Sequence, residues 1–255
     1  MATYQIFDTA AQYYDLFELK SQPTHENIMK ILEDHFAQHG VKSVLDFACG
    51  TGAQSIPLAK KGYRVTACDI SVAMLEIAQR KSPCGCDIAW KQGDMRQSQM
   101  GTFDAVIAML NAIGYLSVSE FMTALRNIRQ HLVPSGLFVC DNANLEAIRA
   151  GGYVTGKMID TAGEHNGTKF VRLCQSTIDL TRGQFTTQWE AYIQQGIQAA
   201  ETFTGTWRRQ IYTCEELEQM LTTAGFRVLK FYDRNGGEFH PKKTFSALVV
   251  AERQT

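Results

Sequence analysis

The chain has 255 residues, 45% of them hydrophobic, which is enough for one large α/β domain or a domain with an insertion. A formal net charge of −1 with scattered Lys and Arg argues against a nucleic-acid partner. No apolar run reaches membrane-spanning length, Met1–Asp8 is not a signal peptide, and the use of seven cysteines fits a reducing cytoplasm.

The N-terminal residues predict two helices. Asp8–Lys20 has apolar residues such as Tyr14 and Phe17 at helical spacing, with Phe7 just before it. Pro23-Thr24 then predicts a second helix with Thr24 as its N-cap, and Gly40 predicts its end.

Strand and helix patterns then alternate. The predicted strands are Val41–Phe47, Tyr63–Asp69, Asp87–Gln92, Phe103–Leu110 and Leu137–Asp141. The predicted helices are Ser55–Lys61, Val72–Lys81 with Ser71 as its cap, and one that runs from the capping box Ser117-Val-Ser-Glu120 to Val133. This order predicts a Rossmann-like, doubly wound and mostly parallel sheet.

The pattern changes after the fifth strand. Alternating runs at Phe170–Cys174, Ser176–Leu180, Phe185–Gln194 and Thr202–Tyr212 predict an inserted antiparallel β-sheet. A second capping box, Thr213-Cys-Glu-Glu216, then opens a helix to Ala224, and Phe226–Tyr232 and Thr244–Ala251 close the chain as an antiparallel hairpin. We therefore expect a seven-stranded sheet domain made of residues 1–149 and 213–255, with residues 1–40 as a helical lid, and an inserted subdomain made of residues 150–212.

Polar residues follow every strand of the predicted parallel sheet. They lie in Gly50–Gly52, Asp69–Ser71, Gly93–Met95, Asn111–Tyr115 and Asp141–Asn144. Because ligands bind outside the carboxyl ends of parallel strands, we expect these segments to meet at one edge of the sheet and to form one site.

The glycine turn after the first strand narrows the ligand class. Gly50-Thr-Gly52 alone is compatible with NAD, FAD, ATP or S-adenosylmethionine, and Asp69 would reach ribose hydroxyls in a dinucleotide enzyme or a methyltransferase. Ser55 stands where a dinucleotide fingerprint has its third glycine, and a P-loop lysine is missing.

Cys84-Gly-Cys86 has no second Cys or His pair, so we predict no metal site there.

The ordered motifs resemble the class I S-adenosylmethionine-dependent methyltransferases. They read VLDFACGTG, ACDISVAML, QGDMR, FDAVIAMLNAIGYL and, near the end, TCEELEQMLTTAGFRV. ACGTG, an early YDLF helix and an insert after the fifth strand are most similar to small-molecule N-methyltransferases such as glycine N-methyltransferase and the sugar-amine dimethyltransferases. The family has glycine at Ala48, an exchange that we expect to be tolerable if φ stays negative.

The resemblance implies a cofactor site for S-adenosylmethionine, with S-adenosylhomocysteine as product. It implies that Asp46 and the backbone from Ala48 through Gly50 to Gly52 hold the methionine end, and that Asp69 takes the ribose hydroxyls. Ile70 and Met74 would lie beside the adenine, Asp94 would accept from its amine, and Met95 and Met109 would line its pocket. Tyr14 would reach over the cofactor.

The acceptor site is predicted from position and analogy. Asn111 and Tyr115 are the candidates to face the transferred methyl group, and Asn142 and Asn144 come next. His165 is a candidate base or a solvated loop residue. Trp189 and Trp207 would line an acceptor pocket walled by the insert, or pack against the parent sheet.

These observations predict a cytoplasmic methyltransferase that acts on a small molecule, with an amine nitrogen as acceptor. The alternatives are an O-methyltransferase, an NAD-linked oxidoreductase, a non-catalytic cofactor-binding module, and an RNA methyltransferase. The RNA methyltransferase is disfavoured by the net charge and because this chain has Met109-Leu-Asn-Ala after the fourth strand in place of an Asn/Asp-Pro-Pro-aromatic tetrapeptide. We expect no nucleic-acid or membrane partner, and the sequence leaves open a homo-oligomer.

Overall fold

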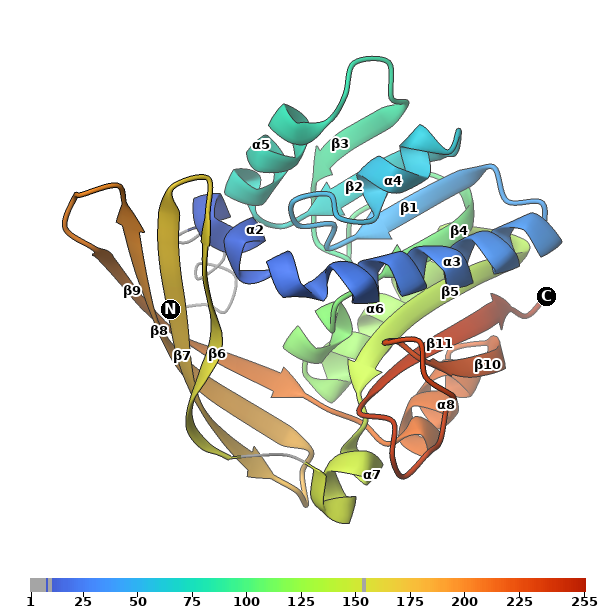
Figure 1. The fold of residues 1–255 in the computed structure, drawn as a ribbon. Helices are drawn as coiled ribbons and strands as arrows, with labels where there is room; N and C mark the ends of the chain where they lie inside the picture. The colour runs from blue at the N-terminus through green and yellow to red at the C-terminus, as the bar shows by residue number, and fades with distance from the viewer. Residues whose placement is uncertain (1–7, 9–10, 153–154) are drawn as a thin grey trace.

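The computed structural model describes residue 8, residues 11–152 and residues 155–255, and contains two β-sheets (Figure 1). The strands of the larger sheet are β1 (Ser43–Phe47), β2 (Arg64–Asp69), β3 (Ile88–Gln92), β4 (Phe103–Ala108), β5 (Leu132–Ala143), β10 (Phe226–Asp233) and β11 (Ser246–Arg253). Their spatial order is β10-β11-β5-β4-β1-β2-β3. β11 is antiparallel to both of its neighbours and the first five strands are parallel, so the predicted sheet is confirmed.

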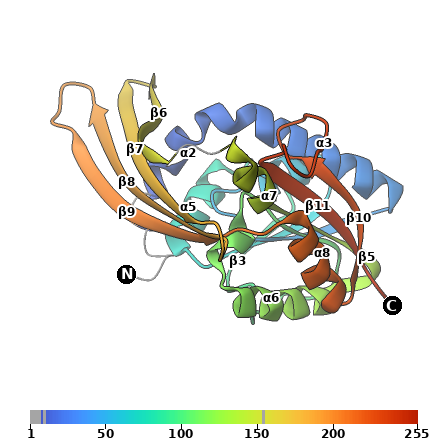
Figure 2. The same cartoon turned by 90° about the horizontal axis from the view of Figure 1, so that it is seen from below.

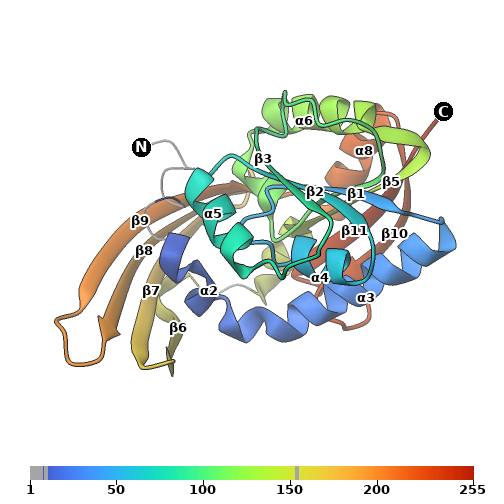
Figure 3. The same ribbon diagram turned by 90° about the horizontal axis from the view of Figure 1, so that it is seen from above.

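Helices cover both faces of this sheet (Figures 2 and 3). They are α3 (Gln22–Gln38), α4 (Ser55–Lys60) and α5 (Val72–Lys81) on one face, and α6 (Val118–Gln130) and α8 (Cys214–Thr223) on the other. Each face has its own apolar core: Leu32 and Phe36 of α3 are fully buried in one, and Phe121 and Leu125 of α6 in the other. Among the described residues, no helix has both the length and the apolar character needed to cross a bilayer.

The second sheet is the predicted insert. Its strands β6 (Gly156–His165), β7 (Thr168–Asp179), β8 (Gln184–Gln195) and β9 (Glu201–Gln210) pair antiparallel in chain order. β7 is one continuous strand where the sequence indicated two runs, and β6 was not recognised, because it is an exposed edge strand with little alternation of apolar residues. The alternate residues of β8 from Phe185 to Ile193 are buried, as predicted.

The N-terminal segment differs most from its prediction. Phe7 lies outside the described residues. Instead of one helix, Asp8–Lys20 contains short turns, η1 (Ala11–Tyr13), α2 (Tyr14–Phe17) and the start of η2 (Leu19–Ser21). Thr24 is not an N-cap, since α3 begins at Gln22 and the Thr24 hydroxyl donates to Asn235 Oδ1 at 2.9 Å. The early turns form because Tyr13 and Phe17 pack into an aromatic cluster with the insert, and this tertiary contact replaces helical continuity.

The capping boxes at Ser117 and Thr213 are confirmed. Replacement of the Thr213 N-cap by Ala removes the side-chain acceptor of the Glu216 N–H, so we expect the free energy of unfolding to fall by about 1 kcal/mol. Denaturant unfolding would measure this. Thr222→Ala, an exposed exchange near the end of the same helix, is the control, and an equal effect of the two variants would contradict the capping argument.

Candidate active site

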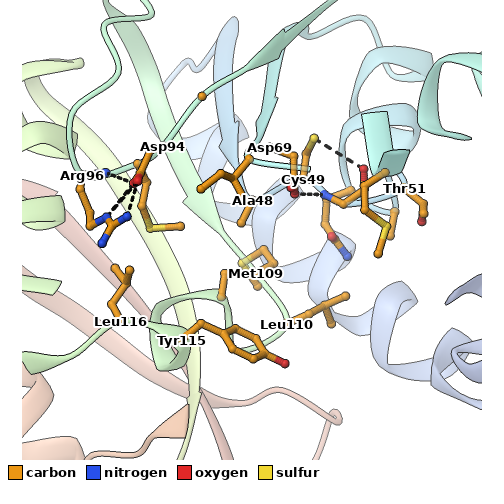
Figure 4. A pocket seen from close by; sticks show the side chains of 18 of the residues that line it. Ala48, Cys49, Thr51, Asp69, Asp94, Arg96, Met109, Leu110, Tyr115 and Leu116 are labelled. Atoms are coloured by element: carbon orange, nitrogen blue, oxygen red, sulfur yellow. Dashed lines mark hydrogen bonds and ion pairs between the residues drawn. The ribbon is translucent and has the colours of Figure 1, made fainter. Parts of the chain in front are cut away.

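A cavity of about 430 Å³ lies at the carboxyl edge of the parallel strands (Figure 4). This volume is within the usual range for small-molecule sites. The lining comes from the segments that follow β1 to β4, together with Tyr14 and the start of α6. The lining residues are Tyr14, Ala48–Thr51, Ala53, Gln54, Asp69, Ile70, Met74, Gly93–Arg96, Met109, Leu110, Ala112, Tyr115, Leu116 and Glu120. The structure thus brings together four of the five predicted polar segments, and the segment after β5 is not among the lining residues.

The turn after β1 is held in a left-handed backbone conformation. The φ angles are 55° at Ala48, 53° at Gly50 and 84° at Gly52. The expectation of a negative φ at Ala48 is wrong, and a side chain in this conformation costs roughly 1–2 kcal/mol. A Cβ at Gly52 would lie 3.0 Å from the Trp90 ring, so packing as well as φ favours glycine there. Gly52 is not itself among the cavity-lining residues.

Asp69 joins the ends of β1 and β2 at the cavity. Its carboxylate accepts the Gly50 N–H at 2.8 Å and the Ser71 N–H at 2.9 Å, and the residue is 8% exposed. Burial raises the pKa of Asp69, although backbone hydrogen bonds from Ser71 and Gly50 oppose the shift. Each carboxylate oxygen has lone-pair capacity left over, so Asp69 can still accept hydrogen bonds from a pair of ligand hydroxyls.

Asp46 lies behind the glycine turn and is not among the cavity-lining residues. It is 1% exposed and accepts the Ser55 hydroxyl at 2.5 Å. Burial raises its pKa to about 7, even though the Ser55 hydrogen bonds lower it. Ser55, the residue that departs from the dinucleotide fingerprint, is therefore the partner of this buried carboxyl. A direct contact of Asp46 with the cofactor stays a prediction.

At the other end of the cavity, Asp94 is paired with Arg96 (Figure 4). Arg96 Nε donates to both carboxylate oxygens at 3.0 Å, and a second arm of the guanidinium pairs with Glu120 of the α6 capping box. Burial alone would raise the pKa of Asp94, but the hydrogen bonds and charge of Arg96 outweigh burial and lower it. The Asp94 carboxyl is therefore kept ionised, and an ionised carboxylate can only accept hydrogen bonds. The sequence analysis missed Arg96 and Glu120, although Glu120 was identified as a capping residue.

The other residues predicted to contact the adenine are apolar residues of the cavity wall. Ile70, Met74, Met95 and Met109 all line the cavity, and the three methionines are buried. They give the cavity apolar walls between the Asp69 end and the Asp94 end, as a flat heteroaromatic ring would require.

The N-terminal segment closes one side of the cavity. Tyr14 is a lining residue, and Asp15 next to it accepts the Thr51 hydroxyl at 2.6 Å and pairs with Lys81 at 2.6 Å. His25 Nδ1 lies 3.0 Å from Gln54 Nε2. The segment is therefore tied to the glycine turn itself. These partners are far apart in sequence, and nothing in the sequence indicates that they pair.

Tyr115 lines the cavity from η3 (Ala112–Tyr115), which follows β4. The chain enters η3 through two left-handed residues, Leu110 with φ 59° and Asn111 with φ 61°. The Asn111 N–H is held by the Asp141 carboxylate at 3.2 Å, and Asp141 pairs with Arg234 at 2.6 Å. Asn111 is not among the lining residues, so of the two residues predicted to face the methyl group the structure brings only Tyr115 to the cavity.

Asn142 and Asn144 are buried and their amides bind backbone. Asn142 donates to Gln210 O and accepts from Tyr212 N, and Asn144 donates to the carbonyls of Pro241 and Thr244. These contacts fasten β5 to the end of the insert and to the C-terminal loop. The structure does not place either residue in the cavity wall, because their polar atoms are used in joining elements.

The three candidates from the insert also lie outside the cavity lining. The ring centroids of Trp189 and Trp207 are 5.6 Å apart, and both rings pack with Tyr13 and Phe17, so they contact the N-terminal segment instead of the parent sheet. His165 is exposed at the end of β6, next to the hairpin turn to β7. Its role as a base has no structural support.

The match with known protein families covers the part of the chain that supplies most of the cavity lining. Residues 44–136, from β1 into β5, match a family model described as a methyltransferase domain. This part of the chain is a methyltransferase domain. The dTDP-3-amino-3,6-dideoxy-alpha-D-glucopyranose N,N-dimethyltransferase of Streptomyces fradiae is 29% identical over 87% of this chain and 86% of its own.

Two further relatives extend the comparison. Human glycine N-methyltransferase is 36% identical, but the match covers 45% of each chain. DesVI of Streptomyces venezuelae has the same fold, with a TM-score of 0.78 and 23% identity over 96% of this chain and 98% of its own. The methyltransferase has the class I fold with the antiparallel insert, as the sequence analysis expected.

The buried carboxyl of Asp46 predicts a specific dependence of stability on pH. Between the ordinary pKa of 3.8 and the folded-state pKa of about 7, the folded protein keeps a proton that the unfolded chain has released. The contribution of Asp46 to the free energy of unfolding therefore falls as pH rises through this range, by about 1.4 kcal/mol per pH unit. It levels off above pH 7.

Denaturant unfolding from pH 4 to pH 8 tests this dependence. In Asp46→Asn, whose amide can still accept from Ser55, we expect this part of the decline to disappear. Asp87→Asn, an exposed exchange at the opposite end of the sheet, should keep the parental profile. A profile unchanged by Asp46→Asn would contradict the shifted pKa.

Proposed function

We propose that this methyltransferase uses S-adenosylmethionine to methylate an amine nitrogen of a small molecule. The observation that supports the cofactor most is the position of Asp69. Its buried carboxylate lines a partly apolar cavity and accepts a hydrogen bond from the Gly50 N–H. A ribose with two free hydroxyls suits this acceptor, and a polyphosphate does not.

The residues present fit the cofactor along its whole length. Asp69 would hold the ribose, Ile70 and Met74 would contact the adenine, and Asp94 would accept from the adenine amine. The left-handed turn at Ala48 and Gly50 keeps the cavity wall thin where the methionine end would lie, since glycine presents no side chain. Tyr14 and Tyr115 would border the sulfur end.

The chemistry needs little from the protein beyond alignment. When bound, S-adenosylmethionine supplies a methyl group on a sulfonium, so that the new N–C bond forms as the S–C bond breaks, its electron pair goes to sulfur and the amine proton goes to a base or to water. Holding the reacting atoms in line can contribute roughly 7–11 kcal/mol. Tyr115 and Tyr14 would exclude water from the space between the sulfur and the acceptor nitrogen, and they would position the acceptor.

The amine acceptor is supported by the relatives, two of which are named for methylation at nitrogen, on an amino sugar and on glycine. We further propose a cytoplasmic location, since all seven cysteines are free thiols and five are buried. The lid formed by residues 1–40, the insert boundaries at 150 and 212, and a homo-oligomer stay predictions.

Cofactor binding is tested at Asp69. In Asp69→Asn the charge of the hydroxyl acceptor is lost, and we expect the affinity for S-adenosylhomocysteine to fall at least tenfold, because a hydrogen bond to a charged group contributes about 1.5–3 kcal/mol. Isothermal titration calorimetry measures the affinity. Asp87→Asn should bind like the parent, and a denaturant curve checks that the Asp69 variant is folded. Equal affinity of all three proteins would contradict the proposed ribose contact.

The acceptor atom is tested with matched pairs of small molecules. Glycine against glycolate, and 3-amino-3-deoxyglucose against glucose, differ in presenting an amine or a hydroxyl. With S-adenosylmethionine, we expect release of S-adenosylhomocysteine with the amines and not with the hydroxyl partners. Release with the hydroxyl compounds alone would identify an O-methyltransferase and contradict the proposal.

A further inference from the structure

Arg209 of β9 lies beside the cavity-lining helix η3. A Cβ built on Gly114 would be 3.7 Å from the Arg209 Cβ and 3.1 Å from the Gln210 carbonyl, so the strand passes directly against the residue before Tyr115. Arg209 is paired with Phe185 in the β8–β9 register, and Phe185 belongs to the buried face of the insert. The side chain of Arg209 is therefore on the inner face of the insert, and its neighbour Arg208 is on the outer, exposed face.

The guanidinium of Arg209 has an aromatic neighbour but no anion. Its Cζ lies 4.8 Å from the centroid of the Phe185 ring, and its buried Nε has no hydrogen-bond partner. Among the described residues, no carboxylate oxygen comes within 4.0 Å of its nitrogen atoms. Two other arginines each have a carboxylate counter-ion, Arg172 in Asp160 at 2.5 Å and Arg234 in Asp141 at 2.6 Å.

The charge of Arg209 acts on the space next to the cavity. Burial raises the pKa of Tyr115, and the positive charge of Arg209 is the main opposing influence, followed by Glu18, which raises the pKa, and Arg172, which lowers it. The charges of Arg209 and Glu18 therefore both influence the Tyr115 hydroxyl. Arg172 is already neutralised by Asp160, so Arg209 is the cation left to meet a ligand there.

We propose that Arg209 binds an oxyanion, a carboxylate or a phosphate, carried by the methyl acceptor. A half-buried guanidinium without a counter-ion is unfavourable, and its planar fork matches carboxylate and phosphate oxygens. Glu18 offers the opposite charge to an ammonium group. This subsite deepens the proposed function, on which it rests, by naming the acceptor class as an amine that also carries an anionic group.

A binding measurement that needs no turnover tests the subsite first. Inorganic phosphate is titrated into the protein loaded with S-adenosylhomocysteine and followed by calorimetry. The parent and Arg208→Gln should bind phosphate in the millimolar range, and Arg209→Gln at least tenfold more weakly. Arg209→Lys, which keeps the charge, should recover part of the affinity. Equal binding by the parent and Arg209→Gln would overturn the proposal.

Methyl transfer to glycine and glycinamide, and to 3-amino-3-deoxyglucose and its 6-phosphate, then tests the acceptor class. We expect the kcat/KM of the anionic member of each pair to be at least tenfold higher, because its KM is lower. This preference should vanish in Arg209→Gln but not in Arg208→Gln. If the neutral amines react equally well, the subsite is wrong and the amine methyltransferase stands. If phosphate binding depends on Arg209 but no amine is methylated, the subsite stands and the amine acceptor is wrong.

Discussion

The structure depends on the reversal of the backbone after β1. Three residues of left-handed conformation, Ala48, Gly50 and Gly52, turn the chain so that the Gly50 N–H faces the Asp69 carboxylate instead of water. The turn also allows Trp90 to pack against Gly52. A strained backbone persists only where its surroundings hold it, and here the buried hydrogen bonds of the neighbouring strand ends do so. Ala48 and Gly50 of this turn line the cavity with small residues.

Residues outside the sheet, in the N-terminal segment, complete the wall of the cavity. The N-terminal segment reaches the glycine turn through Asp15 and Thr51 and reaches the insert through Tyr13 and Phe17. One short segment therefore contacts both the glycine turn after β1 and the inner face of the insert.

The sheet and the segments that line the cavity could be predicted from the sequence because they are encoded locally. Buried strands are continuous apolar runs, caps such as Ser71 and Ser117 are read from neighbouring residues, and parallel strands force their ends together. The acceptor side depends on pairs that are distant in the chain. Nothing in the sequence indicates that Asn142 is used up by backbone hydrogen bonds with Gln210 and Tyr212, or that Arg209 lies on Phe185 without a counter-ion.

The central claim is that one rim of the sheet, organised by the turn after β1, holds an adenosine with its ribose on Asp69. A crystal structure of the protein with S-adenosylhomocysteine tests this most directly. The account predicts both ribose hydroxyls against the Asp69 carboxylate, the adenine between Ile70 and Met74, and the sulfur directed toward Tyr115. A nucleoside bound away from Asp69, or one whose sulfur points away from Tyr115, would contradict it.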